Sequence, residues 1–487
     1  MFYCFTSSAP GVEGGRAYGP FGLFAALECS SDFHQAHEKL KPLGFGEVLA
    51  QKSGGATRND RGPPDDHDET QLPAVTLPGG STTITEAAAR FGDLLAATGR
   101  VFRRRDSVFD LAHDQDGQPI LRPIKPAAFA SRMESVAKLV AFKKTKDGDL
   151  EEVPTTCSET TARLILSAGV FLNRLPPIHV VVPCPVLVER DGQLITITGY
   201  DLESGVLAAG EEPHDISIDE ALTVLDEITA EFNYTSESDR ARHFASLITP
   251  ALVSGGLLGG RAPVDLTEAN ESQAGKGYGN KLTSAVYGMK LRTITQRKSG
   301  VGGIEESFSG ALVSGAPIIS LDNMRGKVDL PCLESFMTED FFQARVPYSG
   351  DVEIDARRIV VMLTSNKAEI TPDFANRAGI KRILKQPDGF QFRQYPEGDI
   401  LDHVRANQPR YLGAVFAIIK AWHEAGKPRT NETRHDFRRW ATTLDWIGKR
   451  PADHIGPMRH SGRQRLGSRL VRLAGSVVGR RRSTSRR

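Results

Sequence analysis

The stretch Glu271-Ser-Gln-Ala-Gly-Lys276-Gly-Tyr278 decides the fold, together with the apolar segment Pro263-Val-Asp-Leu-Thr-Glu-Ala-Asn270 that precedes it. A short glycine-containing loop that ends in lysine, between a strand and a helix, lets backbone N–H groups and an ammonium hold phosphates. The match is degenerate, because the first glycine of Gly-x4-Gly-Lys-Ser/Thr is missing and Gly277 stands where a hydroxyl residue is expected. We therefore expect residues Gln273, Ala274, Gly275, Lys276, Gly277 and Tyr278 to contact a nucleotide.

A buried strand with an acidic end follows this loop. Asp322 comes directly after the apolar run Ile318-Ile-Ser-Leu, which suits a parallel strand whose carboxyl end faces a ligand crevice. A carboxylate there would hold Mg2+ between the β- and γ-phosphates of ATP. The magnesium hydroxyl ligand stays open between Thr283, Ser284 and Ser272, or the ion is held through water alone.

A third apolar run, Ile359-Val-Val-Met-Leu363, ends in Thr-Ser-Asn366. The Asn366 amide is suited to orient an attacking water or to sense the γ-phosphate, although such a turn is also a common structural feature. Asn323 stands where a second acid is expected, so the general base stays open between Glu305, Glu306 and Asp322. Arg377 follows Asn366 closely and is suited to reach a neighbouring subunit's nucleotide; Lys381 and Arg382 lie behind it.

The order of these motifs resembles the superfamily III-like helicase ATPases of phages, plasmids and integrated elements, ring motors of the AAA+ class. Residues 1–47 resemble the end of the primase half to which such motors are often fused, with Gly14-Gly-Arg-Ala-Tyr-Gly-Pro-Phe21 and Gly44-Phe-Gly46 as matching marks. Gly199-Tyr-Asp201, Asp239-Arg-Ala241 and the segment Trp440–Trp446 fit as well. The resemblance implies a homo-oligomeric ring, ATP and Mg2+ as cofactors, single-stranded DNA as a partner and a separately encoded primase.

The sequence predicts an α/β fold with a P-loop NTPase core in a chain of several parts. The expected parts are a primase-like remnant (1–47), a disordered linker (48–80), a small α+β domain (81–212), the ATPase (213–447) and a basic disordered tail (448–487). Ten arginines and one acid follow residue 450, which predicts a tail that binds DNA without sequence preference.

Shorter patterns predict local elements within these parts. The segment Gly14–Leu40 predicts two short helices, and Gly54–Gly80 predicts no regular structure. A capping box predicts a helix over Glu86–Ala97, and alternation predicts a strand over Arg100–Ala112 that turns back at Asp116-Gly117. Turn residues Asp191-Gly192 predict a second hairpin.

Basic residues near the first hairpin suggest a contact with a phosphate backbone, although a solvated face is the more common explanation for such a run. They are Arg100, Arg103, Arg104, Arg105, Lys138, Lys143, Lys144 and Lys146.

The composition is that of an ordinary soluble protein, with 39% hydrophobic and 25% charged residues and a formal charge of +1 among 487 residues. Five scattered cysteines support neither a disulfide framework nor a zinc site. We expect a cytoplasmic protein without membrane contact, since no apolar segment is long and uninterrupted enough to span a bilayer.

These features lead us to expect an ATP-dependent DNA helicase-type motor, the C-terminal part of a mobile-element primase–helicase. The alternative is a decayed remnant that binds nucleotide or DNA without turnover. A metabolic P-loop kinase is a third class, but it would need a phosphoacceptor-binding lid, which the sequence does not show.

Overall fold

The computed structural model describes residues 2–3, 17–18, 24, 26–29, 39, 72–80, 82–145, 149–295, 303–324, 327–328, 330–346, 350–366, 369–433 and 435–449. The expected basic tail and most of the expected linker and primase-like segment lie outside these residues. The chain forms two compact units, Met1–His67 and Asp68–Arg487. In the first, strand β1 (Phe2–Tyr3) pairs antiparallel with β2 (Ala17–Tyr18), so two residues expected to be helical lie in a strand.

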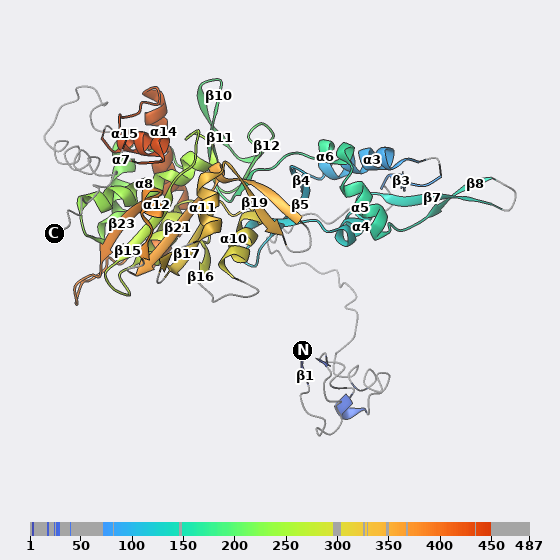
Figure 1. The fold of residues 1–487 in the computed structure, drawn as a ribbon, viewed down its shortest axis with the longest axis horizontal. Helices are drawn as coiled ribbons and strands as arrows, with labels where there is room; N and C mark the ends of the chain where they lie inside the picture. The colour runs from blue at the N-terminus through green and yellow to red at the C-terminus, as the bar shows by residue number, and fades with distance from the viewer. Residues whose placement is uncertain are drawn as a thin grey trace, which may run out of the picture. The chain divides into compact units, whose positions relative to one another are not determined.

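The second unit is a mixed α/β structure built on a six-stranded sheet (Figure 1). The strands occur in the spatial order β14-β23-β15-β21-β17-β16, and all neighbours are parallel except the edge pair β14–β23. Their bounds are β14 (Asn233–Tyr234), β15 (Val264–Ala269), β16 (Arg292–Thr295), β17 (Ile318–Met324), β21 (Val360–Asn366) and β23 (Ala378–Leu384). The three apolar runs identified in the sequence are therefore adjacent central strands.

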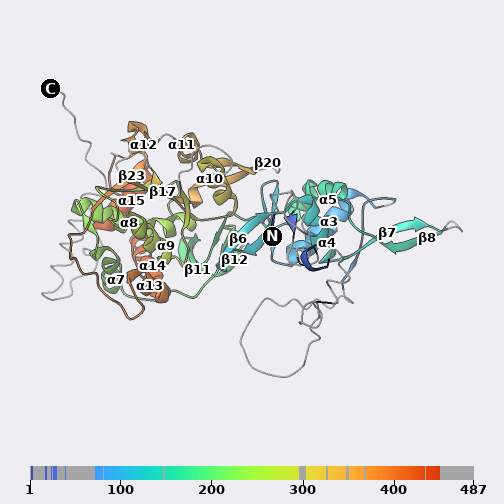
Figure 2. The ribbon, with the colours of Figure 1, turned by 90° about the horizontal axis from the view of Figure 1, so that it is seen from below.

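Alternate side chains of these strands face two separate apolar cores, as the pleat of a sheet requires. Val360 and Met362 join one cluster, whereas Val361 and Leu363 join the other. The first core is covered by helices that lie together in Figure 2: α7 (Ile218–Ala230), α8 (Glu237–Ser254), α9 (Lys276–Val286), α13 (Ile400–Ala406) and α14 (Gln408–Glu424). Helix α15 (Arg438–Lys449) also packs there.

The second core lies under elements that surround the Asp322 strand. They are α10 (Ile304–Val313), α11 (Pro331–Thr338), α12 (Pro372–Asn376) and the antiparallel hairpin of β19 (Phe341–Val346) with β20 (Gly350–Asp355). A short parallel pair, β18 (Lys327–Val328) with β22 (Glu369–Ile370), and a 3-10 turn, η2 (Ala356–Arg358), complete this region.

The preceding α+β region has its own apolar cluster, formed mainly by helices. These are α3 (Ile84–Ala97), α4 (Pro126–Glu134), α5 (Glu159–Leu166) and α6 (Gly169–Arg174). Two three-stranded sheets accompany them: β3 (Ala74–Thr76), β7 (Lys138–Lys144) and β8 (Leu150–Pro154); and β4 (Val101–Arg104), β5 (Ser107–His113) and β6 (Pro119–Pro123). The capping box of α3 is present, since the Thr83 side chain and Glu86 exchange hydrogen bonds.

Two local expectations in this region are wrong. Residues 74–76, expected to lack structure, form β3, because Val75 is buried in the cluster and its strand pairs in parallel with β7. The single strand expected over Arg100–Ala112 is two strands, since the chain reverses at Arg105, which takes φ 49°. The hairpin at Asp191-Gly192 forms as expected, between β10 (Val186–Arg190) and β11 (Gln193–Ile197).

The β4–β5–β6 sheet also contacts the second core of the central sheet. Phe102, Phe109 and Leu121 pack in the same cluster as Phe308 and Leu312 of α10. The remaining short strands, β9 (Val180–Val182), β12 (Gly199–Asp201) and β13 (Val206–Ala208), form a three-stranded sheet that follows. Among the described helices, none has both the length and the apolar character needed to cross a bilayer.

Candidate nucleotide-binding site

The phosphate loop runs from the end of β15 to the start of α9. Gln273 and Gly275 take φ 63° and 88°, so the chain turns sharply before Lys276 begins the helix. The positive φ of Gly275 favours glycine at this position, because other residues rarely adopt that conformation. The N-terminus of α9 lies at the carboxyl end of the sheet strands, and the first N–H groups of a helix favour an anion.

The structure brings Lys276 and Asp322 together. The Oδ1 atom of Asp322 lies 3.6 Å from the position that a Cβ on Gly277 would occupy, in the first turn of α9. Lys276 is 9% exposed, and its Nζ donates a long hydrogen bond of 3.4 Å to the Glu271 carbonyl. Burial lowers the pKa of Lys276, while the nearby Asp322 charge acts in the opposite direction. A cation and a carboxylate thus lie at the end of a helix that favours anions.

Strand β21 lies between the phosphate-loop strand β15 and the Asp322 strand β17. Thr364 of β21 forms hydrogen bonds with β17. Its hydroxyl donates to Asp322 Oδ1 at 2.5 Å and accepts from the Asn323 N–H at 2.8 Å. This residue was not selected from the sequence. The sequence shows a hydroxyl residue near the end of the third apolar run. Only the order of the strands in the sheet shows that this hydroxyl meets Asp322.

Asn366 lies at the same edge of the sheet as the loop. Its backbone is in register with Ala269, the last residue of β15. Asn323 has φ 56°, a left-handed conformation that asparagine tolerates, and it follows Asp322 as the chain leaves the regular ladder. The Asn366 backbone is thereby placed beside the phosphate loop.

Two of the three proposed hydroxyl ligands point into the protein. Thr283 is 1% exposed and donates to the Gly279 carbonyl, and Ser284 is completely buried. Both lie in the second half of α9, away from its N-terminus, whereas Ser272 is exposed on the loop itself. The Ser272 hydroxyl and water therefore remain as candidate oxygen ligands for a cation beside Asp322.

The acids proposed as alternative bases lie in the first turn of α10. Both Glu305 and Glu306 are exposed. Burial, assisted by the Glu305 charge, raises the pKa of the Cys332 thiol in α11 to about 11. Glu305 thus lies near Cys332 of α11.

Arg377 lies at the amino-terminal end of β15, whereas the phosphate loop follows the carboxyl-terminal end of the same strand. Its carbonyl accepts a hydrogen bond from the N–H of Val264, the first residue of β15, whereas the loop follows the last residue, Ala269. Five residue steps of a strand separate these ends by roughly 17 Å. The guanidinium is partly buried and pairs with Asp373 at 3.2 Å. Arg377 is therefore not brought to the phosphate loop of its own chain.

The two basic residues behind Arg377 have internal partners. Lys381 is 2% exposed and lies 2.6 Å from Asp265 and 2.8 Å from the Ser246 hydroxyl. Arg382 pairs with Glu268 of β15 at 2.8 Å. Burial of Lys381 in this pair removes it as a candidate for contact with another subunit.

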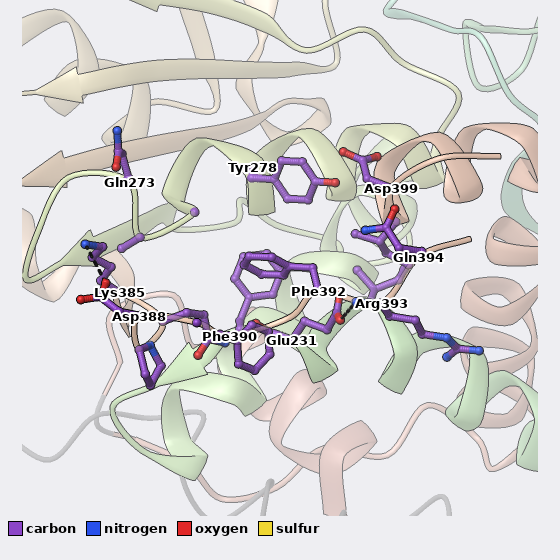
Figure 3. A pocket seen from close by; sticks show the side chains of 18 residues that line it. Glu231, Gln273, Tyr278, Lys385, Asp388, Phe390, Phe392, Arg393, Gln394 and Asp399 are labelled. Atoms are coloured by element: carbon purple, nitrogen blue, oxygen red, sulfur yellow. Dashed lines mark hydrogen bonds and ion pairs between the residues drawn. The ribbon is translucent and has the colours of Figure 1, made fainter. Parts of the chain in front are cut away.

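A cavity of about 580 Å³ opens beside the phosphate loop (Figure 3). It is lined on one side by Gln273, Ala274, Gly275 and Tyr278, and on others by α7 and by the segment 385–394 that follows β23. Phe390 and Phe392 of this segment are 40% and 57% exposed, with ring centroids 5.0 Å apart. The volume is in the range of small-molecule sites, and neither phenylalanine was selected from the sequence.

The segment 385–394, which we name the aromatic strap, is fastened at both ends. At its start, the Lys385 N–H donates to the Asn270 side chain at 3.1 Å. The Gln386 side chain donates to the Glu231 carbonyl at 2.6 Å, and the Arg393 N–H donates to the Glu231 carboxylate at 2.5 Å. The strap is thus held to the phosphate loop and to the end of α7.

Arg104 of the basic cluster has a structural role and is not available for a phosphate contact, whereas Arg100, Arg105, Lys138, Lys143 and Lys144 are exposed and Lys146 lies outside the described residues. Arg104 is 6% exposed and donates to the carbonyls of Leu312, Val313 and His179 at 3.1–3.3 Å. Two of these carbonyls end helix α10, and burial lowers the pKa of Arg104 to about 10. Arg105 pairs with Glu353 of the β19–β20 hairpin at 2.6 Å.

No protein-family model matches the chain, and no curated protein matches it. Among solved structures, the chain is similar to the apo NrS-1 C-terminal region, with 9% identity over 60% of this chain and 71% of that chain, and a TM-score of 0.33. It is also similar to SCCmec type IV Cch, an active helicase, with 11% identity over 76% and 72% of the two chains and a TM-score of 0.33. These likenesses are coarse, so the assignment must come from the residues of this chain.

Proposed function

We propose that this protein is an ATP-dependent DNA helicase-type motor with its nucleotide site at the phosphate loop. The observation that carries the proposal is the convergence of Lys276 and Asp322 at the N-terminus of α9, with the strand of Asn366 between their strands. Phosphate binding needs a cation and free N–H groups, and a metal-bound triphosphate needs a carboxylate beside them. The cavity next to the loop leaves room for the rest of a nucleotide.

Each residue has a separate role in this proposal. Lys276 binds the β- and γ-phosphates, and the N–H groups of Gly275 to Tyr278 hold the same anion. Thr364 donates to the Oδ1 atom of Asp322 and so fixes this carboxylate beside the phosphate loop, where it would hold a cation. Asn366 orients the attacking water.

The donor set fits Mg2+, because a carboxylate, loop hydroxyls and water are the oxygen ligands that this ion prefers. Asp322 and Ser272 would hold it. When bound, Mg2+ supplies charge neutralisation for the phosphates.

Assembly is part of the proposal, since Arg377 lies too far from its own loop to act there. In a homo-oligomeric ring, Arg377 would reach the nucleotide of the neighbouring copy. Its ion pair with the exposed Asp373 is weak by the usual standard of surface pairs, so the guanidinium can change partners at little cost. Single-stranded DNA, a separately encoded primase and an origin in a mobile element belong to the same proposal, as does a cytoplasmic location.

A second candidate is a protein that binds nucleotide without turnover. Asn323 in place of an acid and Gly277 in place of a hydroxyl residue favour it, because both departures weaken hydrolysis more than binding. The two candidates share the site and differ only in catalysis.

An ATPase assay with and without single-stranded DNA tests the proposal on the full chain. We expect hydrolysis that single-stranded DNA stimulates. ATP binding without hydrolysis in either condition would favour the second candidate, and the absence of ATP binding would contradict both.

A further inference from the structure

The cavity beside the phosphate loop presents aromatic faces to a ligand. Phe390 and Phe392 are among the more exposed phenylalanines of the described chain, and both line the cavity together with the Tyr278 ring (Figure 3). The Phe390 and Phe392 rings meet edge to face at 71°, so each leaves part of a face uncovered. An aromatic face of this kind binds a nucleobase by stacking, which every base can provide.

The charged groups that line the cavity already have partners in the protein. The Glu231 carboxylate accepts from the Arg393 N–H, and the Arg393 guanidinium pairs with Glu227 at 3.2 Å. Asp399 accepts from the N–H groups of Leu401 and Asp402 as the N-cap of α13. These contacts hold the strap and the helix in place, and they engage one oxygen of each of these two carboxylates.

The Tyr278 hydroxyl is engaged in the same way. It accepts from the Leu401 N–H at 3.2 Å, and its hydrogen bond with Asp399 helps to keep the pKa of Asp399 below its ordinary value. Lys385 and Asp388 pair with each other across 3.8 Å at the far end of the strap. The tyrosine therefore offers its ring to a ligand rather than its hydroxyl.

Gln394 is an amide among the lining residues, close to Asp399 in Figure 3. An amide carries both an acceptor oxygen and a donor NH2 group, and a rotation exchanges them. It can therefore meet the 6-amino group of adenine or the 6-oxo group of guanine equally well. A group of this kind binds a base edge without selecting one base.

We infer that the nucleoside triphosphate site selects by stacking and not by the base edge, so that it takes ATP and GTP with similar affinity. The inference rests on the proposed nucleotide site and names its substrate class as purine nucleoside triphosphates in general. Sites built to hydrogen-bond a substrate reject a mismatched analogue by ~10⁴-fold or more, whereas apolar pockets discriminate by ~10- to 200-fold at most. Because the Gln394 amide can also adapt to either base, the ratio of the ATP and GTP dissociation constants should lie at the lower end of the range for apolar pockets.

Calorimetry with non-hydrolysable ATP and GTP analogues and Mg2+ tests the inference on the full chain. The expected ratio of the two dissociation constants is below about tenfold. A larger ratio overturns the inference while leaving the proposed function intact. Inorganic tripolyphosphate serves as a probe of the phosphate loop alone. If neither analogue binds and tripolyphosphate does not bind, the result contradicts the proposed function.

The strap is tested by Phe392→Ala, a residue exposed enough for its truncation to spare the core. The substitution should weaken the binding of both analogues by the same factor, about tenfold. It should leave the binding of tripolyphosphate unchanged. Phe392→Tyr should retain both affinities, because it keeps the ring. Phe341→Ala is the matched control, since Phe341 is 41% exposed but lies outside the cavity. Unchanged affinity in Phe392→Ala, or a loss for one analogue only, would overturn the stacking role.

Discussion

Two cations of this chain, Lys276 and Arg104, are almost equally buried but differ in what surrounds them. Lys276 is 9% exposed and Arg104 is 6% exposed. Arg104 donates to three backbone carbonyls at normal distances, and two of them end a helix. Lys276 has a 3.4 Å contact with the Glu271 carbonyl and lies near the Asp322 carboxylate, and its neighbours Ala274 and Gly275 line a large cavity.

The difference teaches that burial alone does not mark a functional cation. A buried guanidinium whose donors meet carbonyls stabilises the fold, because hydrogen bonds to a charged group contribute more to stability than neutral ones. A buried ammonium at a helix N-terminus, next to a loop that lines a cavity, is placed to meet an anionic ligand. Lys381 belongs with Arg104, since Asp265 and Ser246 surround it.

The largest expected effect concerns Arg377, which lies at the far edge of the sheet from the loop. Arg377→Ala should keep ATP affinity and lower turnover ~10³-fold or more, because an arginine supplied across an interface stabilises transition-state charge. Steady-state hydrolysis and equilibrium nucleotide binding measure the two quantities separately.

Mixing the Arg377→Ala and Lys276→Ala proteins sharpens the same prediction. One copy then supplies the arginine and the other the loop, so part of the activity should return. Arg382→Ala is the control, since Arg382 pairs with Glu268 inside the subunit. If the two inactive proteins co-assemble and stay inactive, Arg377 does not act across the interface.

The next effect in size is on stability. Arg104→Met should lower the free energy of unfolding by about 3 kcal/mol, because it removes a charged donor from the carbonyls of Val313 and His179. Arg105→Met should cost less than about 1 kcal/mol, since the Arg105 side chain is 62% exposed and its ion pair with Glu353 is solvated. Urea denaturation of both variants measures the difference. Equal costs would show that the carbonyl contacts of Arg104 do not stabilise the fold.

The smallest effect depends on His243, which lies under the phosphate-loop helix. Its Nδ1 atom is 2.6 Å from the Tyr234 hydroxyl, and burial, with the Lys381 charge, holds its pKa well below 6.5. The unfolded chain then binds a proton that the folded chain does not, so stability falls as the pH falls below about 6.5. The slope from this group is at most about 1.4 kcal/mol per pH unit.

His243→Gln should remove that part of the pH dependence. Denaturation midpoints at pH 7.5 and pH 5.5 measure it, with the same substitution at the exposed His113 as the control. An unchanged pH dependence in His243→Gln would mean that His243 is not buried in its neutral form.

The sequence predicted the parts of the sheet that depend on local pattern. The runs before Asp322 and Asn366 are strands that are mainly apolar, and β15 alternates apolar with polar residues; the α3 capping box and the Asp191-Gly192 turn are further local signals. The β3 strand was missed, because three residues in a Gly- and Pro-rich stretch form a strand only through their partner, β7.

The candidate site was predictable only in part for the same reason. Lys276 and Asp322 follow from their places after strands, whereas Thr364 and the aromatic strap gain their contacts from tertiary structure alone. Arg104 shows the opposite error. The density of arginines in the first hairpin suggests a nucleic-acid contact, but this member of the run is buried and meets carbonyls more than 200 residues away in the chain.

The most direct test of the account compares Lys276→Ala with Lys281→Ala by equilibrium binding of a non-hydrolysable ATP analogue. Both lysines belong to α9, but Lys281 is exposed and lies more than a turn beyond the loop. The account predicts that Lys276→Ala loses at least ~10²-fold in affinity with an unchanged melting temperature, since the lysine contributes a charge-assisted contact to the phosphates. Lys281→Ala should bind as the wild type does. Equal affinity in the two variants would contradict the assignment of this loop as the nucleotide site.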